Sequence, residues 1–464
     1  MTIQEIFNSN NDVNSIIAEL KNKTIYVPSW SGRFGLEKEY NPKKHPVMNK
    51  AIYPDISNPD GTIESVTRVT YDLQRLAVNR MSELICGIPV KRIYKPENDT
   101  QKKIASYMEK IFLKNRIDTV NIERTRYLFA GCEVLTLWYA VEDRNNLYGF
   151  TSPLKIRCKN FSPMNGDELY PYFDDYGDMI AMSVAYSKRI ANKTTNYFET
   201  YTADHHYKWS NSGAGEWITE VDEIITLGKI PAIYLNRPTP IWEHTSGIVY
   251  EMEWSMSRNG NYLRKNSKPL FTIFSDEVID YGNEKSENKE ARSIIQLPQG
   301  AKAEYVTWTQ AIENLKFYIT ELRQSFFTQL QLPDWSYESM KSTPMSGESR
   351  KQLFIDAQLK VKDESGRLLE AFDREVNVVK SFLKIALGER MASEIEALPV
   401  ESEITAYSIN DEADTIKNLT TANGGKPIMS QRESIEEFGH STDIDKTMQE
   451  LAEENMIDGF NLTE

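Results

Sequence analysis

A single apolar stripe of helical period, beginning near Ser346 and ending at Leu387, is the feature that most limits how this chain can fold. At ~1.5 Å per residue the predicted helix is roughly 60 Å long, and Gly388 would end it. A helix of this length is uncommon in a compact enzyme core. The apolar residues recur at three- and four-residue spacing: Leu353, Ala357, Val361, Leu368, Phe372, Val376, Val379 and Leu383.

Two further helices are predicted before the long one, at residues 246–267 and 308–331. The first is stopped by Lys268 and Pro269, because the residue before a proline is disfavoured in a helix. The second has one apolar stripe that stops before Pro333. Between the two helices, a strand-like LFTIF run at 270–274 is followed by a polar stretch at 276–292, which we expect to be an exposed excursion.

The first 245 residues predict a mixed domain of helices and strands. Helical periodicity covers residues 2–20, 63–85, 101–114 and 119–130. An alternating segment at 133–139 predicts a strand, and short β-rich runs separated by turn residues fill residues 154–233. The expected fold class is therefore α+β and mainly helical.

The net charge of −14 is concentrated at the C-terminal end. Residues 389–464 contain 18 acidic and 5 basic residues, a balance of −13. This segment is predicted to form an acidic domain of short helices, broken at Pro399, at Gly424 and Gly425, at Pro427 and at Gly439. Affinity for DNA comes largely from Lys and Arg that displace counterions, so the acidic segment 389–464 should not bind DNA tightly. The simpler alternative is a solvated acidic domain with no such role.

Catalytic motifs are nearly absent from the sequence. It has no phosphate-binding G-x-x-x-x-G-K-[ST] loop, no H-E-x-x-H, no G-x-S-x-G and no C-x-x-C. The three cysteines, Cys86, Cys132 and Cys158, lack metal-type spacing and are predicted to be buried, reduced thiols. We therefore expect no enzyme activity, no cofactor and no metal. The remaining enzymatic alternative is a nuclease that would use Asp174, Asp175 and His205.

The chain shows no signal for a membrane. No run of eighteen apolar residues occurs, and the N-terminus has neither a basic start nor an apolar stretch of signal-peptide type. The protein is expected to stay where it is made.

Five segments together resemble the portal proteins of long-tailed, siphovirus-type bacteriophages. Their order and spacing match over about residues 63–390, and the succession of a helix, a Lys-Pro excursion, a second helix, a Pro-Asp loop and a Ser-Gly-led long helix is unusual. The segments are ELICGIPV (83–90), KIPAIYLN (229–236), SMSRNGNY (255–262) leading to KPLF (268–271), LPQG (297–300) with Trp308, and LPDWS (332–336) leading to MSGES (345–349).

The resemblance implies a portal fold that is assembled as a ring of about twelve copies. Each copy would contain a wing, a stem, a clip, a tunnel loop and a crown. Mapped onto this sequence, the wing is 1–245 together with the long helix 346–388, the stem is the helices 246–267 and 308–331, the clip is 268–307, the tunnel loop is 332–345 and the crown is 389–464.

The resemblance also implies partners and a location. The ring would be the DNA channel at one capsid vertex of the virion, used for genome packaging, head-tail joining and DNA ejection, and assembled in the host cytoplasm. Double-stranded DNA would pass through without sequence recognition. Other partners would be the large terminase, head-completion or adaptor proteins, and the major capsid and scaffolding proteins. The alternative is a head-tail adaptor or another minor virion structural protein.

Two groups of residues are the candidates for contact with these partners. The tunnel-loop group lies in or beside a breaker-rich loop between two long helices, where a few cations would meet DNA, and the clip group would dock the terminase and later the head-completion proteins. The tunnel-loop candidates are Lys341, Ser342, Thr343, Arg350 and Lys351, and the clip candidates are Asp276, Glu277, Asp280 and Tyr281.

Overall fold

The computed structural model divides the chain into two compact units. The first contains residues 1–339 and 356–407, and the second contains residues 340–355 and 408–464. The structure describes residues 3–8, 12–22, 25–31, 35–57, 59, 61–213, 215–266, 270–274, 302–306, 312–334, 355–406, 421, 429–438 and 444–460.

The first unit is built on a three-stranded antiparallel sheet with the order β11-β4-β5. Side chains alternate between the two faces of a strand. Val134 and Trp138 of β4 therefore join a helical core, while Leu135 and Leu137 face a second sheet. The three strands are β4 (Glu133–Asn145), β5 (Ser152–Phe161) and β11 (Ala232–Asn236).

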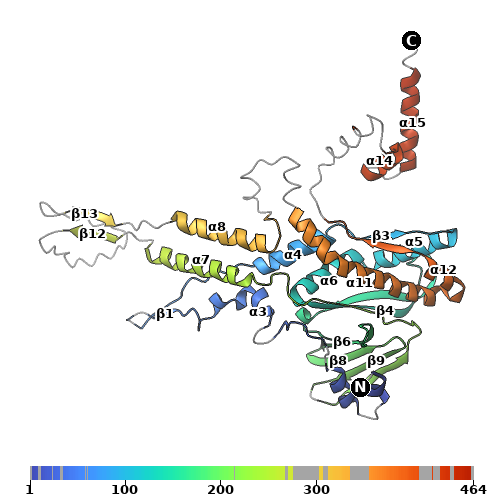
Figure 1. The fold of residues 1–464 in the computed structure, drawn as a ribbon, viewed down its shortest axis with the longest axis horizontal. Helices are drawn as coiled ribbons and strands as arrows, with labels where there is room; N and C mark the ends of the chain where they lie inside the picture. The colour runs from blue at the N-terminus through green and yellow to red at the C-terminus, as the bar shows by residue number, and fades with distance from the viewer. Residues whose placement is uncertain are drawn as a thin grey trace. The chain divides into compact units, whose positions relative to one another are not determined.

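The second sheet is a five-stranded antiparallel meander with the order β10-β9-β8-β7-β6. Met182 and Val184 on one face pack with Leu135 and Leu137 of the first sheet. Phe198 on the other face packs with Ile17 and Leu20 of the N-terminal helices. These helices lie beside the sheet in Figure 1. These strands confirm the β-rich prediction for 154–233: β6 (Glu168–Phe173), β7 (Met179–Ile190), β8 (Lys193–Tyr201), β9 (His205–Asn211) and β10 (Ile218–Ile224).

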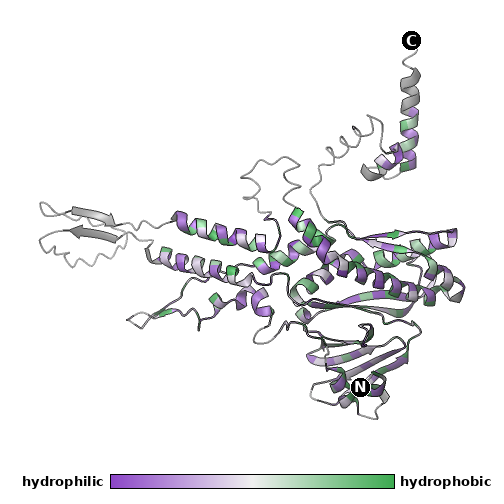
Figure 2. Ribbon diagram, in the orientation of Figure 1, coloured by the Kyte–Doolittle hydropathy of each residue, from purple (hydrophilic) through white to green (hydrophobic). Residues whose placement is uncertain are grey.

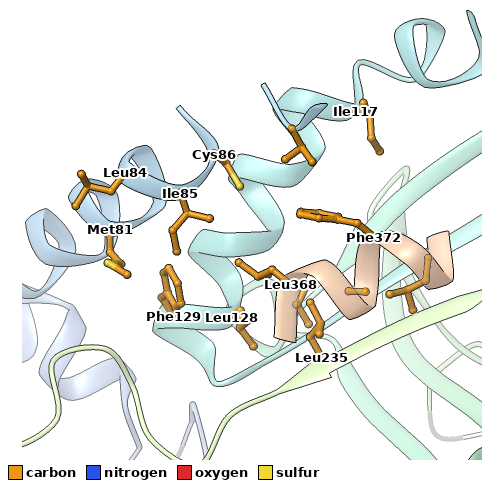
Figure 3. Close-up of a cluster of buried hydrophobic side chains, with 14 of the residues drawn as sticks. Met81, Leu84, Ile85, Cys86, Ile117, Leu128, Phe129, Leu235, Leu368 and Phe372 are labelled. Carbon is orange, nitrogen blue, oxygen red and sulfur yellow. The ribbon is translucent and has the colours of Figure 1, made fainter. Parts of the chain in front are cut away.

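Four helices cover the opposite face of the three-stranded sheet and form the main core. In Figure 3, Met81 and Ile85 of α4 lie toward Phe129 of α6, while Leu368 and Phe372 of α11 lie on the other side of α6. The helices predicted at 101–114 and 119–130 are confirmed as α5 and α6. The four are α4 (Leu73–Cys86), α5 (Asp99–Lys114), α6 (Ile117–Gly131) and α11 (Ile355–Leu387).

Helix α11 confirms the long apolar stripe. It has 33 residues and is therefore about 50 Å long. The predicted start at Ser346 lies outside the described residues. At the other end Gly388 has φ +81°, the left-handed conformation that commonly terminates a helix. Hydrophilic and hydrophobic residues alternate along this helix in Figure 2, as expected of a helix with one buried face.

A buried charge cluster ties α11 to the sheet. Glu375 is fully buried, and its carboxylate accepts hydrogen bonds from Arg124 of α6 and from Trp138 Nε1 of β4 at 3.1 Å. Arg92 of β3 (Lys91–Tyr94) lies 3.3 Å from the other carboxylate oxygen. Arg124 also donates to Thr136 at 2.8 Å. Because an unpaired buried charge is costly, the cluster fixes where α11 lies along the sheet.

Two of the predicted helices are wrong in their extent. The segment 2–20 forms two helices, α1 (Ile3–Asn8) and α2 (Val13–Leu20), and the carboxylate of Asp12 caps the second by accepting the Ser15 N–H at 3.0 Å. The segment 63–85 is helical only from Leu73. Its earlier residues are extended, because side chains of another helix take their backbone N–H groups.

The expectation of only short helices after residue 389 is also wrong. The strand β14 (Val400–Glu403) pairs with β3, and the carboxylate of Glu394 in α12 (Ala392–Ala397) accepts bonds from Asn98 and Gln101. Residues 389–406 thus pack within the first unit, whose members include 356–407. A period-based prediction missed this strand because only four residues alternate.

The described part of the second unit contains two helices, α14 (Gln431–Phe438) and α15 (Ile444–Phe460). Ser430 Oγ accepts the Glu433 N–H at 3.2 Å, and Glu433 in return accepts the Ser430 N–H at 2.9 Å. This reciprocal pair is a capping box that starts α14. Arg432 then joins Asp445 of α15 at 2.8 Å.

Several short elements complete the described fold. They are α3 (Glu37–Tyr40), the 3-10 helices η1 (Pro42–Lys44), η2 (Pro46–Met48), η3 (Pro163–Asn165) and η4 (Glu389–Met391), and the paired strands β1 (Ile56–Ser57) and β2 (Ile63–Glu64). Among the residues described, no helix has the length and apolar character needed to cross a bilayer.

Replacing Glu375 by alanine should lower the free energy of unfolding by about 3–5 kcal/mol, because two buried guanidinium groups lose their carboxylate. Urea titration followed by tryptophan fluorescence measures this, since Trp138 donates to that carboxylate. The control is Glu370→Ala on the same helix, which breaks an exposed pair with Arg374 and should cost less than ~0.5 kcal/mol. Equal effects of the two substitutions would contradict the assigned role of the cluster.

Candidate functional site

Helices α7 (Ser246–Asn266) and α8 (Ile312–Gln329) form an antiparallel pair (Figure 1). The hydroxyl of Tyr318 on α8 donates to Glu251 on α7 at 3.1 Å. Strand β12 (Leu270–Phe274) follows α7 and pairs with β13 (Lys302–Val306), which precedes α8. Both predicted helices and the LFTIF strand are confirmed, whereas β13 was not predicted. Figure 2 shows mostly hydrophilic residues along this helix pair, with isolated hydrophobic ones.

An extended segment at residues 67–71 lies along one face of α7 and is joined to it by regularly spaced hydrogen bonds. The backbone N–H groups of Thr67, Val69 and Tyr71 are its donors. They donate to Asn261 at 2.5 Å, to Ser257 at 2.8 Å and to Glu253 at 2.7 Å, respectively. Donors two residues apart on the segment thus meet acceptors four residues apart on the helix.

Gly260 makes the close approach of this segment possible. A Cβ atom at Gly260 would lie 2.8 Å from the Cγ2 atom of Thr67, so any larger residue here would force Thr67 to shift. Ser257, Gly260 and Asn261 all belong to the SMSRNGNY segment singled out in the sequence. The structure therefore gives that segment a physical role, which is to hold residues 67–71 against α7.

A buried histidine fixes the same region from the other side. His45 Nδ1 lies 2.7 Å from the Glu253 carboxylate, and His45 Nε2 lies 2.9 Å from the backbone carbonyl of Glu39. Both side chains of the His45–Glu253 pair are fully buried. The carboxylate of Glu39 accepts bonds from Trp242 and Ser246 at the start of α7. Residues 39–71 thus brace α7 over most of its length.

The C-terminal end of α8 has a well-defined geometry. Gln331 adopts φ +54°, and the Leu332 N–H donates to the Phe327 carbonyl at 3.0 Å while the Gln331 N–H donates to the Thr328 carbonyl at 3.1 Å. This pattern is a Schellman motif, which ends a helix and reverses the chain. Lys360 of α11 caps the same end by donating to the Leu330 carbonyl at 2.8 Å.

Asp334 is the last described residue of this segment and belongs to the predicted tunnel loop 332–345, and two arginines hold it. Arg323 of α8 donates to both of its carboxylate oxygens, at 2.9 and 3.2 Å. Arg80 of α4 lies 3.6 Å from the same carboxylate and donates to the Pro333 carbonyl at 3.0 Å. Burial lowers the pKa of Arg80, and the Asp334 carboxylate opposes that shift. The chain therefore leaves α8 from a fixed point.

The predicted contact residues themselves lie outside the described part of the chain. This holds for all nine candidates: Lys341, Ser342, Thr343, Arg350, Lys351, Asp276, Glu277, Asp280 and Tyr281. The structure describes the framework on which they are carried, namely α7, α8, Asp334 and α11. Sequence reasoning missed Arg80, Arg323 and Asp334 as a unit. The signal in the sequence was a charged residue, Arg80, within the apolar stripe of a predicted helix. Such a signal does not reveal that its partner is Asp334, 254 positions away.

Two of the three residues of the nuclease alternative, Asp174 and His205, have ordinary structural roles. Asp174 caps the turn between β6 and β7, where its Oδ1 accepts the N–H groups of Tyr176 and Asp178. His205 begins β9 and stacks on Tyr207 with ring centroids 5.4 Å apart. No cluster of three or more potential metal ligands forms within the described ranges. All three cysteines are free thiols; Cys86 and Cys132 are buried as predicted, whereas Cys158 is only half-buried.

Replacing Asp334 by alanine should loosen the junction after α8, because Arg80 and Arg323 lose their shared carboxylate. We expect amide hydrogen exchange at Gln331 and Leu332 to accelerate, with a loss of about 1–3 kcal/mol in local stability. The matched control is Asp373→Ala on the exposed face of α11, which should leave this exchange unchanged. Unaltered exchange in Asp334→Ala would show that the Schellman motif alone sets the junction.

Comparison with known proteins identifies the family. The profile of the phage portal proteins described as SPP1 Gp6-like matches residues 35–457. Among curated proteins none matches the chain. Two solved structures are similar. The first is the neck of an empty gene transfer agent particle computed with C6 symmetry, with 9% identity and a TM-score of 0.39; the match covers 86% of this chain and 94% of that chain. The second is the virion of a native gene transfer agent particle, with 10% identity and a TM-score of 0.36; the match covers 91% of this chain and 98% of that chain. Because the profile spans most of its length, the chain belongs to the SPP1 Gp6-like family of phage portal proteins.

Proposed function

We propose that copies of this chain assemble head to tail into a ring of about twelve, which forms the DNA channel at one vertex of the capsid. The ring would serve genome packaging, head-tail joining and DNA ejection. The observation that carries this proposal is the family match over residues 35–457. It favours a portal over a head-tail adaptor, and membership of a structural family supports the prediction that the chain is not an enzyme.

Exposed apolar side chains on the helix pair support ring assembly. Phe317 of α8 is 67% exposed, Tyr318 is 43% exposed and Leu263 of α7 is 54% exposed. Leu359 of α11, at 60%, is exposed as well. Single exposed apolar side chains are ordinary on a protein surface, so it is the family match that makes these residues candidates for the ring interface. A neighbouring copy in a head-to-tail ring would cover them.

The division into parts follows the sequence mapping with one revision. We assign residues 1–245 with α11 to the wing, α7 and α8 to the stem, 268–307 to the clip and 332–345 to the tunnel loop. The crown would begin at about Ser408 instead of 389, since 389–406 pack within the first unit. From Ser408 onward there are 13 acidic and 4 basic residues. Such a segment would repel passing phosphates and not bind them.

The tunnel loop would start from the junction held by Arg80 and Arg323. A loop attached at a fixed point can present a few cations to DNA reproducibly. We assign this contact to Lys341, with Ser342, Thr343, Arg350 and Lys351 as further candidates. Asp276, Glu277, Asp280 and Tyr281 in the clip would dock the large terminase and then the head-completion proteins.

The location and remaining partners follow from the same proposal. The ring would form in the host cytoplasm with the major capsid and scaffolding proteins and would remain in the virion at one vertex. Negative-stain electron microscopy of the purified protein tests this directly, because it counts the subunits around any ring. Isolated subunits under every assembly condition, and in virions, would refute the proposal.

Two phenylalanines on α8 separate assembly from folding. Phe317→Asp should leave the monomer folded and abolish ring assembly, because the exposed phenyl group of Phe317 can be covered only by a neighbouring subunit. Phe326→Asp should unfold the protein, because Phe326 is fully buried in the main core and an unpaired charge there costs several kcal/mol. Mass photometry measures assembly, and circular dichroism measures folding. Normal rings in Phe317→Asp would exclude this face as the interface.

Replacing Lys341 by glutamate should leave folding and ring formation intact and impair packaging or retention of DNA, because a repulsive charge replaces an attractive one. The ratio of filled to empty capsids from a complemented phage measures the effect. Lys103→Glu on the exposed face of α5 is the charge-matched control and should package normally. Normal packaging with Lys341→Glu would remove this residue from the channel.

A further inference from the structure

The imidazole ring of His45 is fully buried, and both of its nitrogens face oxygen atoms. Nδ1 lies 2.7 Å from Oε1 of Glu253, and Nε2 lies 2.9 Å from the backbone carbonyl oxygen of Glu39. An ionised carboxylate and a carbonyl oxygen can each accept a hydrogen bond but cannot donate one. Turning the ring over would place carbon atoms opposite both oxygens, so the observed orientation is the one that forms two hydrogen bonds.

These two contacts require two protons on the imidazole ring. A neutral imidazole carries a single N–H and can therefore serve only one of the two acceptors. Its other nitrogen would then direct a lone pair at an oxygen lone pair, at 2.7 or 2.9 Å and away from water. The doubly protonated ring donates to both oxygens at once. The geometry around His45 thus matches an imidazolium.

Glu253 has few other partners for its charge. Its side chain is fully buried, and Oε1 also accepts the backbone N–H of Tyr71 at 2.7 Å. Oε2 forms no hydrogen bond with any residue that the structure describes. Among those residues, His45 is also the one side chain that can carry a positive charge within ion-pair distance of the carboxylate. Since an uncompensated buried carboxylate is costly, each side chain stabilises the charged form of the other.

The remaining ionisable groups around the pair do not replace that cation. Tyr250 of α7 lies edge-on to the histidine, with ring centroids 5.3 Å apart, and burial, Glu39 and Glu253 raise the pKa of its phenol. Burial and Glu253 also raise the pKa of Tyr71, a shift that Arg323 opposes. Both phenols therefore stay neutral near pH ~7. The Glu39 carboxylate is occupied by the donors at the start of α7.

The pair lies where three parts of the first unit meet. His45 precedes η2, Glu253 belongs to α7, and Tyr71 ends the extended segment 67–71. The carboxylate thus contacts residues that are 208 and 182 positions away in the sequence. Of the three hydrogen bonds that hold the segment on α7, the one at Tyr71 has the charged acceptor. A change in the charge balance of the pair would act on that bond directly.

We propose that His45 and Glu253 form a proton-dependent lock, in which a buried imidazolium–carboxylate pair holds residues 67–71 on α7 and loss of its proton releases them. Without that proton, the Glu253 carboxylate would remain in the core with no cation beside it, and one of the two oxygens would face a nitrogen lone pair. Opening of this region to water would relieve both costs. The lock goes beyond the channel function and does not depend on ring assembly.

The direction of the pH effect follows from the number of bound protons. A histidine in an unfolded chain loses its second proton near pH ~6.5, whereas the locked pair retains it. Above this pH the folded state therefore binds one proton more than the unfolded state, and its stability falls as the pH rises. Between pH ~5 and ~6.5 both states hold the proton, so the pair adds no pH dependence there.

Nitrogen NMR of the full-length protein with isotope-labelled histidine tests the number of protons. At pH ~7.5 we expect one imidazole with two protonated nitrogens, and His45→Gln should remove its signals. His244→Gln, at an exposed histidine, is the control and should leave those signals in place. A ring at position 45 with one bare nitrogen would overturn the lock.

Amide hydrogen exchange measures the release of the segment, and it needs no substitution at His45. Above pH ~7.5 the opening constant of the Tyr71 N–H should rise about tenfold per pH unit. This rise comes in addition to the intrinsic increase of exchange with pH, which the Leu332 N–H reports in the same sample. Equal pH dependence at the two amides would contradict the proposal.

A neutral side chain at position 253 separates the lock from an ordinary hydrogen bond. Glu253→Gln should abolish the additional pH dependence at Tyr71, because an amide can accept the Tyr71 N–H and donate to a neutral imidazole. The matched control is Glu251→Gln on the same helix, which should leave it unchanged, since Glu251 bonds with Tyr318 and Ser255 instead. If the additional rise persisted in Glu253→Gln, it would belong to another group and the lock would be refuted.

Discussion

The carboxylate of Glu375 is the contact on which the arrangement of the first unit depends. It lies in the core between Arg124 and Arg92, with Trp138 as a third donor. A buried ion pair adds little net stability compared with well-packed hydrocarbon, but it penalises every misplaced alternative. If apolar contacts alone held α11, the helix could shift by one turn along its axis at a modest cost in free energy. The charge cluster excludes such a slide, and it thereby also sets where Lys360 of the same helix meets the end of α8.

The helix pair combines apolar packing with polar contacts. Val249 and Met252 of α7 and Phe326 and Phe327 of α8 join the main core, while much of the remaining surface of the two helices is hydrophilic. The segment 39–71 adds hydrogen bonds from the backbone and from His45, and Arg80 with Arg323 holds the chain where α8 ends. Apart from the local pair of Arg323 and Asp334, these contacts join positions separated by about 180 to 250 residues. A framework held in this way can leave apolar groups such as Phe317 exposed for a neighbour.

The sequence predicted the elements whose period is long and regular. Helices α5, α6, α7, α8 and α11 and most strands were recognisable, because each buries one face over many residues. Predictions failed where tertiary contacts override local pattern. Val66 and Val69 continue a helical period, but their segment is extended because α7 supplies the hydrogen-bond acceptors. Strand β14 is too short to show alternation. The candidate contact residues came from family resemblance, whereas the pairing of Arg80 with Asp334 required coordinates.

The ladder between residues 67–71 and α7 has a built-in register. Four residues of a helix advance ~6.0 Å and two residues of a strand ~6.6 Å, while the helix acceptor turns by ~40° at each step, so only a few rungs can align. A shift by one rung toward the start of α7 would offer Val249 in place of an acceptor. Valine has no polar side-chain group. The segment therefore cannot slip by one step toward the start of the helix. Its three hydrogen bonds thus fix which residues of 67–71 meet which residues of α7.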